Sequence, residues 1–439
     1  MKRKLDMYAY VCPTNGEYVD ERGEKLFNGD FRTEERYREY KDCGFDTLLL
    51  LGNDEYDGDY ENSDLKRNLS LCGKAGLNCI AYDKYIYELS QKTSALVGDG
   101  CMFDSDNRLI DRLIGRMEPY FKNPRFRGLE FVDEPKAENF AAIGDLYAAL
   151  RKIDEKIYVN TVLLPFVEGM EKSYTDKNLF GIKAYEDYID EWFLVTKSKS
   201  FDFDVYPFVF GEGETESDEG HIFPVYLLNM QTVAKKVKEH NAEFYVVLQS
   251  YASRSGAKNC AFKRKMGLAD FRYQKNVALS FGAKDFRYYT YWLFPNQLGD
   301  PSSEAIMTEK GEKVYYDYVK TVNGELKKEF ETIGDYDYVK TELIGELPHF
   351  KGVVSEKIEG VVIAADVPII VNEMKTGKKR ALYIVNADNP SKKIKANVSF
   401  ACDSKSVKVL LNGNRTEYCE TNGKYKIVLN EGEGAFIEL

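Results

Sequence analysis

Short apolar runs alternate with longer amphipathic segments eight times before residue 335. Each run has the length of a buried strand, and each amphipathic segment has the 3.6-residue period of a helix with one apolar face. Repeated strand–helix units of this kind build a parallel sheet covered by helices. The expected strands are Met7–Val11, Thr47–Leu51, Asn78–Tyr82, Leu129–Val132, Ile157–Thr161, Phe203–Tyr206, Phe244–Gln249 and Phe286–Tyr291.

Glycines mark several helix ends. Gly44, Gly76 and Gly282 stand just before the second, third and eighth strands, where a helix terminates in left-handed backbone. Eight units favour closure into a (β/α)8 barrel, because no glycine-rich phosphate loop supports the alternative of an open doubly wound sheet. The expected helices are Thr33–Lys41, Leu65–Ala75, Leu109–Phe121, Ala137–Ile153, Ile182–Thr196, Pro224–Asn241, Met266–Ser280 and Lys310–Thr321.

The sequence pattern changes near residue 335. Short runs with a period of two follow, separated by turns such as Asn412-Gly413 and Asn422-Gly423, and these predict an antiparallel β-sandwich. We therefore expect a barrel domain over 1–335 and an accessory sandwich over 336–439. A structural role is expected for the sandwich, with sugar binding as the alternative. Its expected strands are Gly360–Ala364, Ile369–Val371, Ala381–Val385, Lys395–Phe400, Ser406–Leu411, Tyr425–Leu429 and Gly434–Leu439.

Composition excludes several classes of function. The net charge is −11 and no block of Lys or Arg matches a phosphate backbone, so nucleic acid is not an expected partner. No apolar stretch reaches the roughly 18 residues of a membrane span, and no apolar signal region begins the chain, so we expect a cytoplasmic protein without membrane contact, with a secreted mature form left open. Eight scattered cysteines and three histidines argue against zinc, and no metal or cofactor is expected. The oligomeric state is left open.

Two adjacent acids and a proline, Asp133-Glu134-Pro135, end the fourth expected strand. Proline disfavours helical backbone in the preceding residue, so both acids are expected in extended geometry at the carboxyl end of the strand. In a barrel of this kind that end is the functional face. Asp133 has an alternative role as the cap of the helix that starts at Ala137, whereas Glu134 would cap a helix poorly.

The other strand ends present acids, amides and aromatic rings to the same face. Asp204 lies among apolar residues, where a buried carboxylate needs a partner. Gln249 ends a run of apolar residues and needs hydrogen-bond partners there. For the aromatic residues near 290, packing at the rim is an equal alternative to substrate contact. The side chains expected to bind substrate are Asn53, Tyr82, Asn160, Tyr206, Gln249, Tyr251, Tyr289, Tyr291 and Trp292.

Such a set of side chains suits cleavage of a glycosidic bond. One carboxylic acid protonates the leaving oxygen, a second group stabilises the oxocarbenium-like centre, and aromatic rings stack on the sugar. A carbohydrate is therefore the expected substrate. The catalytic candidates are Glu134, Asp133 and Asp204.

These residues, over roughly 5 to 330, resemble the (β/α)8 glycoside hydrolases of the clan that places its general acid/base at the end of strand four. The resemblance implies that Glu134 is the acid/base. That clan has Asn before this Glu and a nucleophilic Glu at the end of strand seven, where the present chain has Asp133 and Gln249. A glutamine cannot supply a nucleophilic carboxylate. The segments that end at Phe208, Ser250 and Trp292 are also similar to uncharacterised bacterial glycoside-hydrolase-like barrels.

The Asp-Glu pair resembles that of the barrel hexosaminidases, which implies that Asp133 orients a 2-acetamido group of the substrate as an internal nucleophile. Alternatively, Asp204 is the second carboxylate: a separation of about 5 to 5.5 Å from Glu134 would fit a retaining enzyme and about 6.5 to 9.5 Å an inverting one.

A non-catalytic carbohydrate-binding barrel, suggested by Gln249, is a further hypothesis. A lyase or isomerase that uses Asp83 or Lys84 is another.

Overall fold

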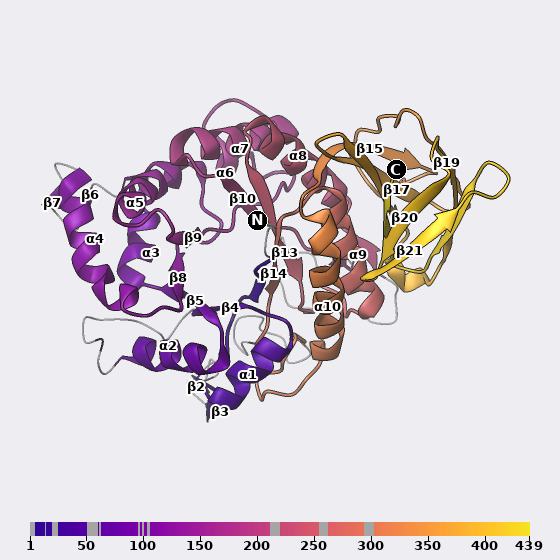
Figure 1. Cartoon of the computed structure of the whole chain (residues 1–439). Coiled ribbons are helices and arrows are strands. Elements are labelled where there is room, and N and C mark those ends of the chain that lie inside the picture. The colour runs from indigo at the N-terminus through magenta and orange to yellow at the C-terminus, as the bar shows by residue number, and fades with distance from the viewer. Residues whose placement is uncertain are drawn as a thin grey trace. The chain divides into compact units, whose positions relative to one another are not determined.

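The computed structural model describes residues 5–13, 15–19, 25–50, 60, 63–94, 97–98, 101–102, 106–210, 220–253, 262–293 and 303–439. They belong to a mixed α/β protein with parallel strands and a C-terminal antiparallel region (Figure 1). The chain divides into two compact units. The N-terminal unit comprises Asp6–Asp204 and Lys235–Val247, and the C-terminal unit comprises mainly Val205–Ala234 and Leu248–Leu439.

Six parallel strands organise the N-terminal unit. They are β4 (Thr47–Leu50), β5 (Asn78–Tyr82), β8 (Phe126–Glu130), β9 (Tyr158–Asn160), β10 (Ser200–Asp204) and β13 (Glu243–Gln249), of which the last ends in the C-terminal unit. The first four form one sheet in chain order, and a parallel bridge between Leu163 and Phe203 leads from β9 toward β10. Because neighbouring strands run the same way, their carboxyl ends lie along one edge.

Helices separate these strands. They are α1 (Glu34–Asp42), α2 (Asp64–Ala75), α3 (Lys84–Ser90), α4 (Asp106–Phe121), the short 3-10 helix η2 (Ala137–Asn139), α5 (Phe140–Ile153), α6 (Glu171–Tyr174), α7 (Ile182–Thr196) and α8 (Tyr226–Glu239). Thr33 and Ser63 cap α1 and α2 by accepting from backbone N–H groups. Gly76 has φ +70° after α2 and Gly44 has φ +103° after α1, as predicted from their positions.

Short elements that the sequence pattern did not predict also occur. They are the hairpin of β2 (Asn15–Val19) and β3 (Lys25–Asp30), the pair β6 (Val97–Gly98) and β7 (Cys101–Met102), and the pair β11 (Phe208–Val209) and β12 (His221–Ile222). The strand predicted at Met7–Val11 is present as the shorter β1 (Tyr8–Ala9). None of the helices in the described ranges combines the length and apolar character needed to cross a membrane.

Gly128 fixes the contact between β8 and β9. A Cβ atom at this position would lie 1.9 Å from the carbonyl oxygen of Tyr158, its neighbour in register. Substitution to alanine is therefore expected to push the strands apart and to lower the free energy of unfolding by about 1 to 3 kcal/mol or more. Urea denaturation measures this loss.

Gly73 in α2 provides the matched control. No atom lies within 4 Å of the Cβ that Gly73→Ala would add, and the change should stabilise the protein by up to about 1 kcal/mol because alanine favours helix. Equal stability of Gly128→Ala and the wild type would contradict the close approach.

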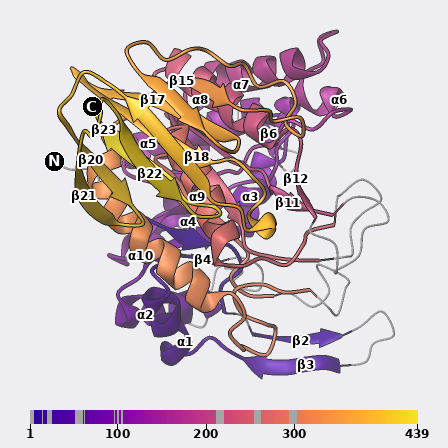
Figure 2. The ribbon, with the colours of Figure 1, turned by 90° about the vertical axis from the view of Figure 1, so that its right-hand side faces the viewer.

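The C-terminal unit contains helices and two antiparallel sheets. In chain order it contains α9 (Leu268–Ser280), β14 (Asp285–Tyr289) and α10 (Tyr316–Ile333). The larger sheet has the order β15 (Asp337–Ile344), β17 (Ile369–Thr376), β18 (Lys379–Asn386), β23 (Gly434–Glu438), β20 (Ser406–Leu411) and β21 (Asn414–Cys419). The smaller sheet has the order β16 (Val362–Ala365), β19 (Ala396–Ala401) and β22 (Tyr425–Leu429). Val371 and Ile384 of the larger sheet share one buried core with Phe400 and Ile427 of the smaller. Figure 2 shows strands of both sheets in orange to yellow.

These sheets pack against α9 and α10 through buried polar contacts. Asn276 Nδ2 donates to the carbonyl oxygen of Gly432 at 2.9 Å, and the Tyr383 hydroxyl donates to Asn276 Oδ1 at 3.0 Å. Lys275 and Glu329 form a fully buried ion pair at 2.6 Å. The antiparallel sheets thus belong to one compact unit with these two helices, and the domain boundary at residue 335 stays a prediction.

Candidate active site

The segment 131–135, which we call the acid loop, carries Asp133 and Glu134. The strand β8 ends at Glu130, so the prediction of a strand over Leu129–Val132 was shifted toward the C-terminus. The acid loop leaves the sheet because its backbone N–H groups donate to two other segments, the helix α3 and the chain at the end of β9. Phe131 donates to the Asn160 carbonyl oxygen (2.8 Å), Val132 to Ser90 Oγ (2.8 Å), Asp133 to the Tyr87 hydroxyl (3.4 Å) and Glu134 to the Val162 carbonyl oxygen (2.9 Å).

Glu134 has a φ of +48°, so the expectation of extended geometry at this residue was wrong. The following proline disfavours the right-handed helical region, but the bonds of the acid loop hold Glu134 in the left-handed region instead. Seven described non-glycine residues have positive φ, and five of them follow helices or lie in hairpin turns. The other two, Glu134 and Val11, follow parallel strands, and strain at such positions is typical of functional sites.

Glu134 and Asp204 are brought together by the fold. Asp204 is the last residue of β10, is only 8% exposed, and forms a hydrogen bond with the Glu134 side chain. A hydrogen bond between two carboxyl groups requires that one of them be protonated. Incomplete solvation raises the pKa of Glu134, and the bond to Asp204 offsets part of this rise. The pair therefore tends to retain one proton.

Asp133 titrates differently from an ordinary aspartate. Desolvation and the neighbouring Glu134 charge raise the pKa of Asp133 to about 7, against a smaller opposite effect of the Glu134 backbone N–H. Both acid side chains keep exposed surface. The desolvation therefore comes from the protein atoms around the acid loop rather than from complete enclosure.

The raised pKa of Asp133 predicts a dependence of stability on pH. Between the unfolded value near 3.8 and the folded value of about 7, the native state binds more protons than the unfolded state. The contribution of Asp133 to the free energy of unfolding is therefore fully present below pH 3.8. It is lost as the pH rises through 7. The stability of Asp133→Asn relative to that of the wild type should therefore increase as the pH rises from 4 to 8.

Urea denaturation at several pH values checks this expectation. Asp111→Asn, at an exposed position of α4, serves as the control for the removal of one carboxylate. A constant difference between Asp133→Asn and the wild type over this range would contradict the raised pKa.

A tyrosine of α7 binds the acid loop, and a tyrosine of α6 binds the segment that follows β9. The Tyr188 hydroxyl donates to the Pro135 carbonyl oxygen at 2.6 Å and accepts from the Leu164 backbone N–H at 3.4 Å. The Tyr174 hydroxyl donates to the Pro165 carbonyl oxygen at 2.7 Å. Sequence reasoning missed these residues, because tyrosines at helical spacing indicate only a core-facing side.

Asn160 and Glu130 form a buried polar pair beneath the acid loop. Asn160, predicted to bind substrate, is fully buried; its Nδ2 donates to Glu130 and to the Tyr10 hydroxyl, and its Oδ1 accepts from the Tyr8 hydroxyl. Glu130 is 1% exposed. Sequence reasoning missed this pair, because Glu130 is a single acid within a run that otherwise predicts a strand.

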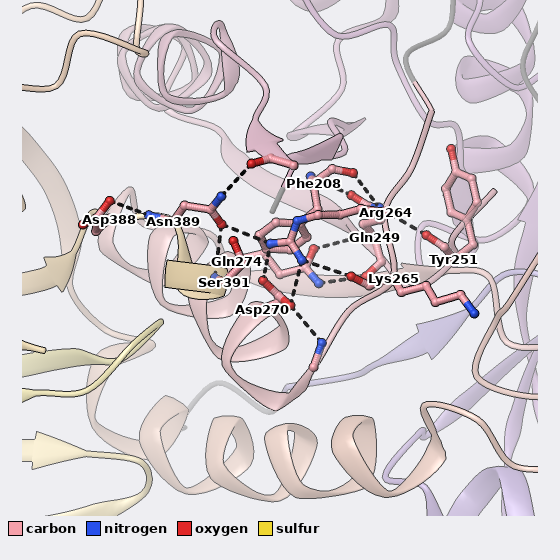
Figure 3. Close-up of polar contacts among 12 residues, drawn as sticks. Phe208, Gln249, Tyr251, Arg264, Lys265, Asp270, Gln274, Asp388, Asn389 and Ser391 are labelled. Atoms are coloured by element: carbon pink, nitrogen blue, oxygen red, sulfur yellow. Dashed lines mark hydrogen bonds and ion pairs between the residues drawn. The ribbon is translucent and has the colours of Figure 1, made fainter. Parts of the chain in front are cut away.

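Gln249 is also occupied by protein groups. It is fully buried at the end of β13, where Oε1 accepts from the Phe208 N–H at 2.9 Å (Figure 3). Nε2 donates to the carbonyl oxygens of Phe208 at 3.2 Å and Tyr251 at 3.1 Å. Both amide hydrogens are therefore used, and the side chain connects β13 to β11 and to the segment after β13. The Gln274 amide in turn bonds the Gln249 backbone.

A buried arginine extends this network in the C-terminal unit. Arg264 lies over the Phe208 ring at 4.7 Å and forms an ion pair with Asp270 at 2.6 Å (Figure 3). Its Nη2 also donates to Asn389 Oδ1 at 3.2 Å. Sequence reasoning missed these residues as well, since 125 positions separate Arg264 from Asn389 in the chain.

Three predicted substrate contacts, Tyr206, Tyr251 and Tyr289, form an aromatic cluster in the C-terminal unit. Their ring centroids lie 5.3 Å apart for 206–251, 5.3 Å for 251–289 and 6.1 Å for 206–289. All three residues are half-buried. By contrast, Tyr291 and Trp292 are 0% and 1% exposed and belong to the core.

The remaining candidates lie elsewhere. Tyr82 is half-buried against Tyr87 at 5.0 Å, and Asn53 lies outside the described residues. Asp83 is fully buried, caps α3 and binds both Arg116 and the Tyr120 hydroxyl at 2.7 Å, so it has a structural role. Within the described part of the chain, no group of three or more His, Cys, Asp or Glu residues is arranged to hold a metal ion.

Comparison with known proteins relates the fold to glycoside hydrolases. No family model matches the sequence, and no curated protein matches it. A solved structure described as a glycoside hydrolase matches with a TM-score of 0.53 and 10% identity over 99% of this chain and 92% of the other. Amy13B of Eubacterium rectale matches with a TM-score of 0.51 and 11% identity over 100% and 96%.

A β-galactosidase from the psychrophilic Marinomonas ef1 matches with a TM-score of 0.48 and 11% identity over 75% of this chain. The chain spans 60% of that enzyme. The fold is glycoside-hydrolase-like, at low sequence identity throughout.

Proposed function

We propose that the protein is a retaining glycoside hydrolase in which Glu134 is the general acid/base and Asp204 the nucleophile. The parallel strands would belong to a (β/α)8 barrel and the antiparallel sheets to an accessory β-sandwich. The main support is the hydrogen-bonded pair Glu134–Asp204. Hydrogen-bond contact does not fit the separation of about 6.5 to 9.5 Å that leaves room for water in inverting enzymes, and it is nearer to the retaining distance.

The proposed reaction follows from this pair. Desolvation raises the pKa of Glu134 and so favours its acid form, and substrate entry between the two carboxyl groups, which removes the opposing bond to Asp204, would turn that acid toward the glycosidic oxygen. Asp204 attacks the anomeric carbon as the bond to the leaving group breaks, giving a covalent glycosyl-enzyme. Glu134, now ionised, removes a proton from water, and the hydroxyl displaces Asp204.

The substrate is proposed to be an oligosaccharide or glycoconjugate. Aromatic faces such as those of Tyr206, Tyr251 and Tyr289 suit stacking on sugar rings. The occupied amide of Gln249 argues against a direct role for that residue in binding or catalysis.

A second candidate is the substrate-assisted mechanism, favoured by the exposed Asp133 beside Glu134. In that case Asp133 would orient a 2-acetamido group, and cleavage would be limited to 2-acetamido sugars.

A mechanism-based trap distinguishes the candidates. Wild-type protein is first screened with a panel of 4-nitrophenyl glycosides, including N-acetylhexosaminides. The matching 2-deoxy-2-fluoro glycoside with a dinitrophenyl leaving group should then add one glycosyl mass to the peptide that contains Asp204. Turnover confined to N-acetylhexosaminides without labelling would favour Asp133. Oligosaccharide binding without any turnover would instead identify a non-catalytic barrel and overturn the proposal.

A further inference from the structure

The edge strand β21 of the C-terminal unit is almost wholly exposed. It is the last strand of the larger sheet, beside β20 (Figure 1), and of its residues only Tyr418 is partly covered. No further strand of the described chain follows it in the sheet order. A strand at such an edge presents backbone donors and acceptors with which another strand can pair.

The turn before β21 decides which residues present these groups. Asn412 and Gly413 form a hairpin turn with φ of +48° and +74°, and Leu411 pairs with Asn414 across it. The residues that flank such a turn bond to each other, and bonded positions alternate along the strand. The backbone groups of Asn414 and of every second residue after it therefore face β20.

The far end of the strand agrees with this alternation. The Glu420 backbone N–H donates to the Lys405 carbonyl oxygen at 3.4 Å, as expected for a residue an even number of positions after Asn414. The intervening residues Arg415 and Glu417 therefore direct their backbone N–H and carbonyl groups to the open edge. A strand that pairs with this edge must bond to these two residues.

Charges alternate across this side of the sheet. The register places Glu438 of β23 opposite Lys408 of β20, and Lys408 opposite Glu417 of β21. Directly opposed residues share one face of a sheet, and opposite charges in such positions stabilise the pairing. The row runs negative, positive, negative and ends at Glu417, so a cation on the next strand would continue it.

We propose that β21 pairs with β21 of a second copy of this chain, antiparallel and centred on Thr416, to form a symmetric dimer. In this register Arg415 of each copy lies opposite Glu417 of the other. The two pairs supply about four backbone hydrogen bonds, because both residues present their groups to the edge. A two-fold axis makes the pairs identical, so the surface is complementary to itself.

The charges select this register over its neighbours. A pairing centred on Arg415 would oppose two arginines, and one centred on Glu417 would oppose two glutamates. Like charges in directly opposed positions destabilise a sheet. The contact does not depend on the proposed glycosidase activity.

Charge reversal tests the pairing. Sedimentation velocity of the full chain over a wide range of concentrations should show a monomer–dimer equilibrium. Arg415→Glu and Glu417→Arg should each raise the dissociation constant by roughly tenfold or more, because opposite-charge pairs become like-charge pairs. An equimolar mixture of the two variants should recover dimers, since the mixed pair opposes unlike charges again. This recovery also shows that both variants are folded.

A disulfide locates the two-fold axis. Opposed residues that share no hydrogen bond have Cα atoms about 4.5 Å apart, within reach of a disulfide. In a Cys419→Ser background, which removes the exposed thiol of β21, Thr416→Cys should link to its own copy under mild oxidation. Asn414→Cys is the matched control: it is also exposed, but it lies opposite Tyr418 of the second copy and should not link.

A wild-type chain that stays monomeric at every concentration would overturn the proposal. The charges of β21 would then serve to keep its edge unpaired. Dimers that neither charge reversal weakens, or that the mixture fails to recover, would overturn it equally, because the two chains would then meet at another surface.

Discussion

Glu134→Gln is expected to lower kcat/KM for an alkyl or sugar leaving group by roughly 10²- to 10⁴-fold. Glutamine has nearly the same shape but carries no acidic proton, so the leaving oxygen departs unprotonated. The loss should shrink for a 2,4-dinitrophenyl glycoside, whose leaving group needs little protonation, and azide should accelerate the second step because it attacks without a general base. Steady-state kinetics on paired glycosides measures both effects.

Glu138→Gln is the matched control for this variant. Glu138 is an exposed acid in η2, close to Glu134 in the chain, and its replacement should leave kcat/KM unchanged. Wild-type activity in Glu134→Gln across the whole panel would remove Glu134 from the mechanism and, with it, the retaining and substrate-assisted proposals alike.

Asp204→Asn is expected to have the larger effect, with a loss of kcat on the order of 10⁴-fold or more, because it removes the group that forms the covalent intermediate. The amide can still donate to Glu134, so the fold should persist. Azide at high concentration should restore turnover of an activated glycoside and give a glycosyl azide of inverted configuration, which NMR identifies.

A comparison of Asp204→Asn with Asp133→Asn decides between the retaining mechanism and the substrate-assisted mechanism. A retained activity of Asp204→Asn together with loss in Asp133→Asn would contradict Asp204 as nucleophile. Circular dichroism and urea denaturation of both variants show whether any loss arises from unfolding.

Local patterns in the sequence predicted much of the secondary structure. The strands Asn78–Tyr82 and Ser406–Leu411 and the helix Ile182–Thr196 have the predicted bounds, because strong periodicity coincides there with clear end signals. The strand β21 was missed because its residues are almost all exposed, so no alternating apolar pattern exists. The hairpin β2–β3 was missed as well.

The details of the site were less predictable, because they depend on contacts between distant segments. The pattern identified Asp133, Glu134 and Asp204 as acids near strand ends, and the structure joins Glu134 to Asp204. The sequence pattern could not show that Glu134 adopts left-handed backbone. That conformation depends on hydrogen-bond partners 28 or more residues away, such as Val162. Asn160 was assigned to substrate for the same reason, since its partners Tyr8 and Tyr10 are about 150 positions away.

The Gln249 side chain has an evolutionary consequence. Glutamine and glutamate codons differ by a single base, so a carboxylate at this position is easily reached by mutation. A carboxylate, however, would lose both donors and face the carbonyl oxygens of Phe208 and Tyr251 in a fully buried site. A lineage that carries this arrangement must therefore rebuild the contact with β11 before a nucleophile can arise at residue 249. The intermediates on that path would be less stable, so selection confines the search for a second carboxylate to other strand ends.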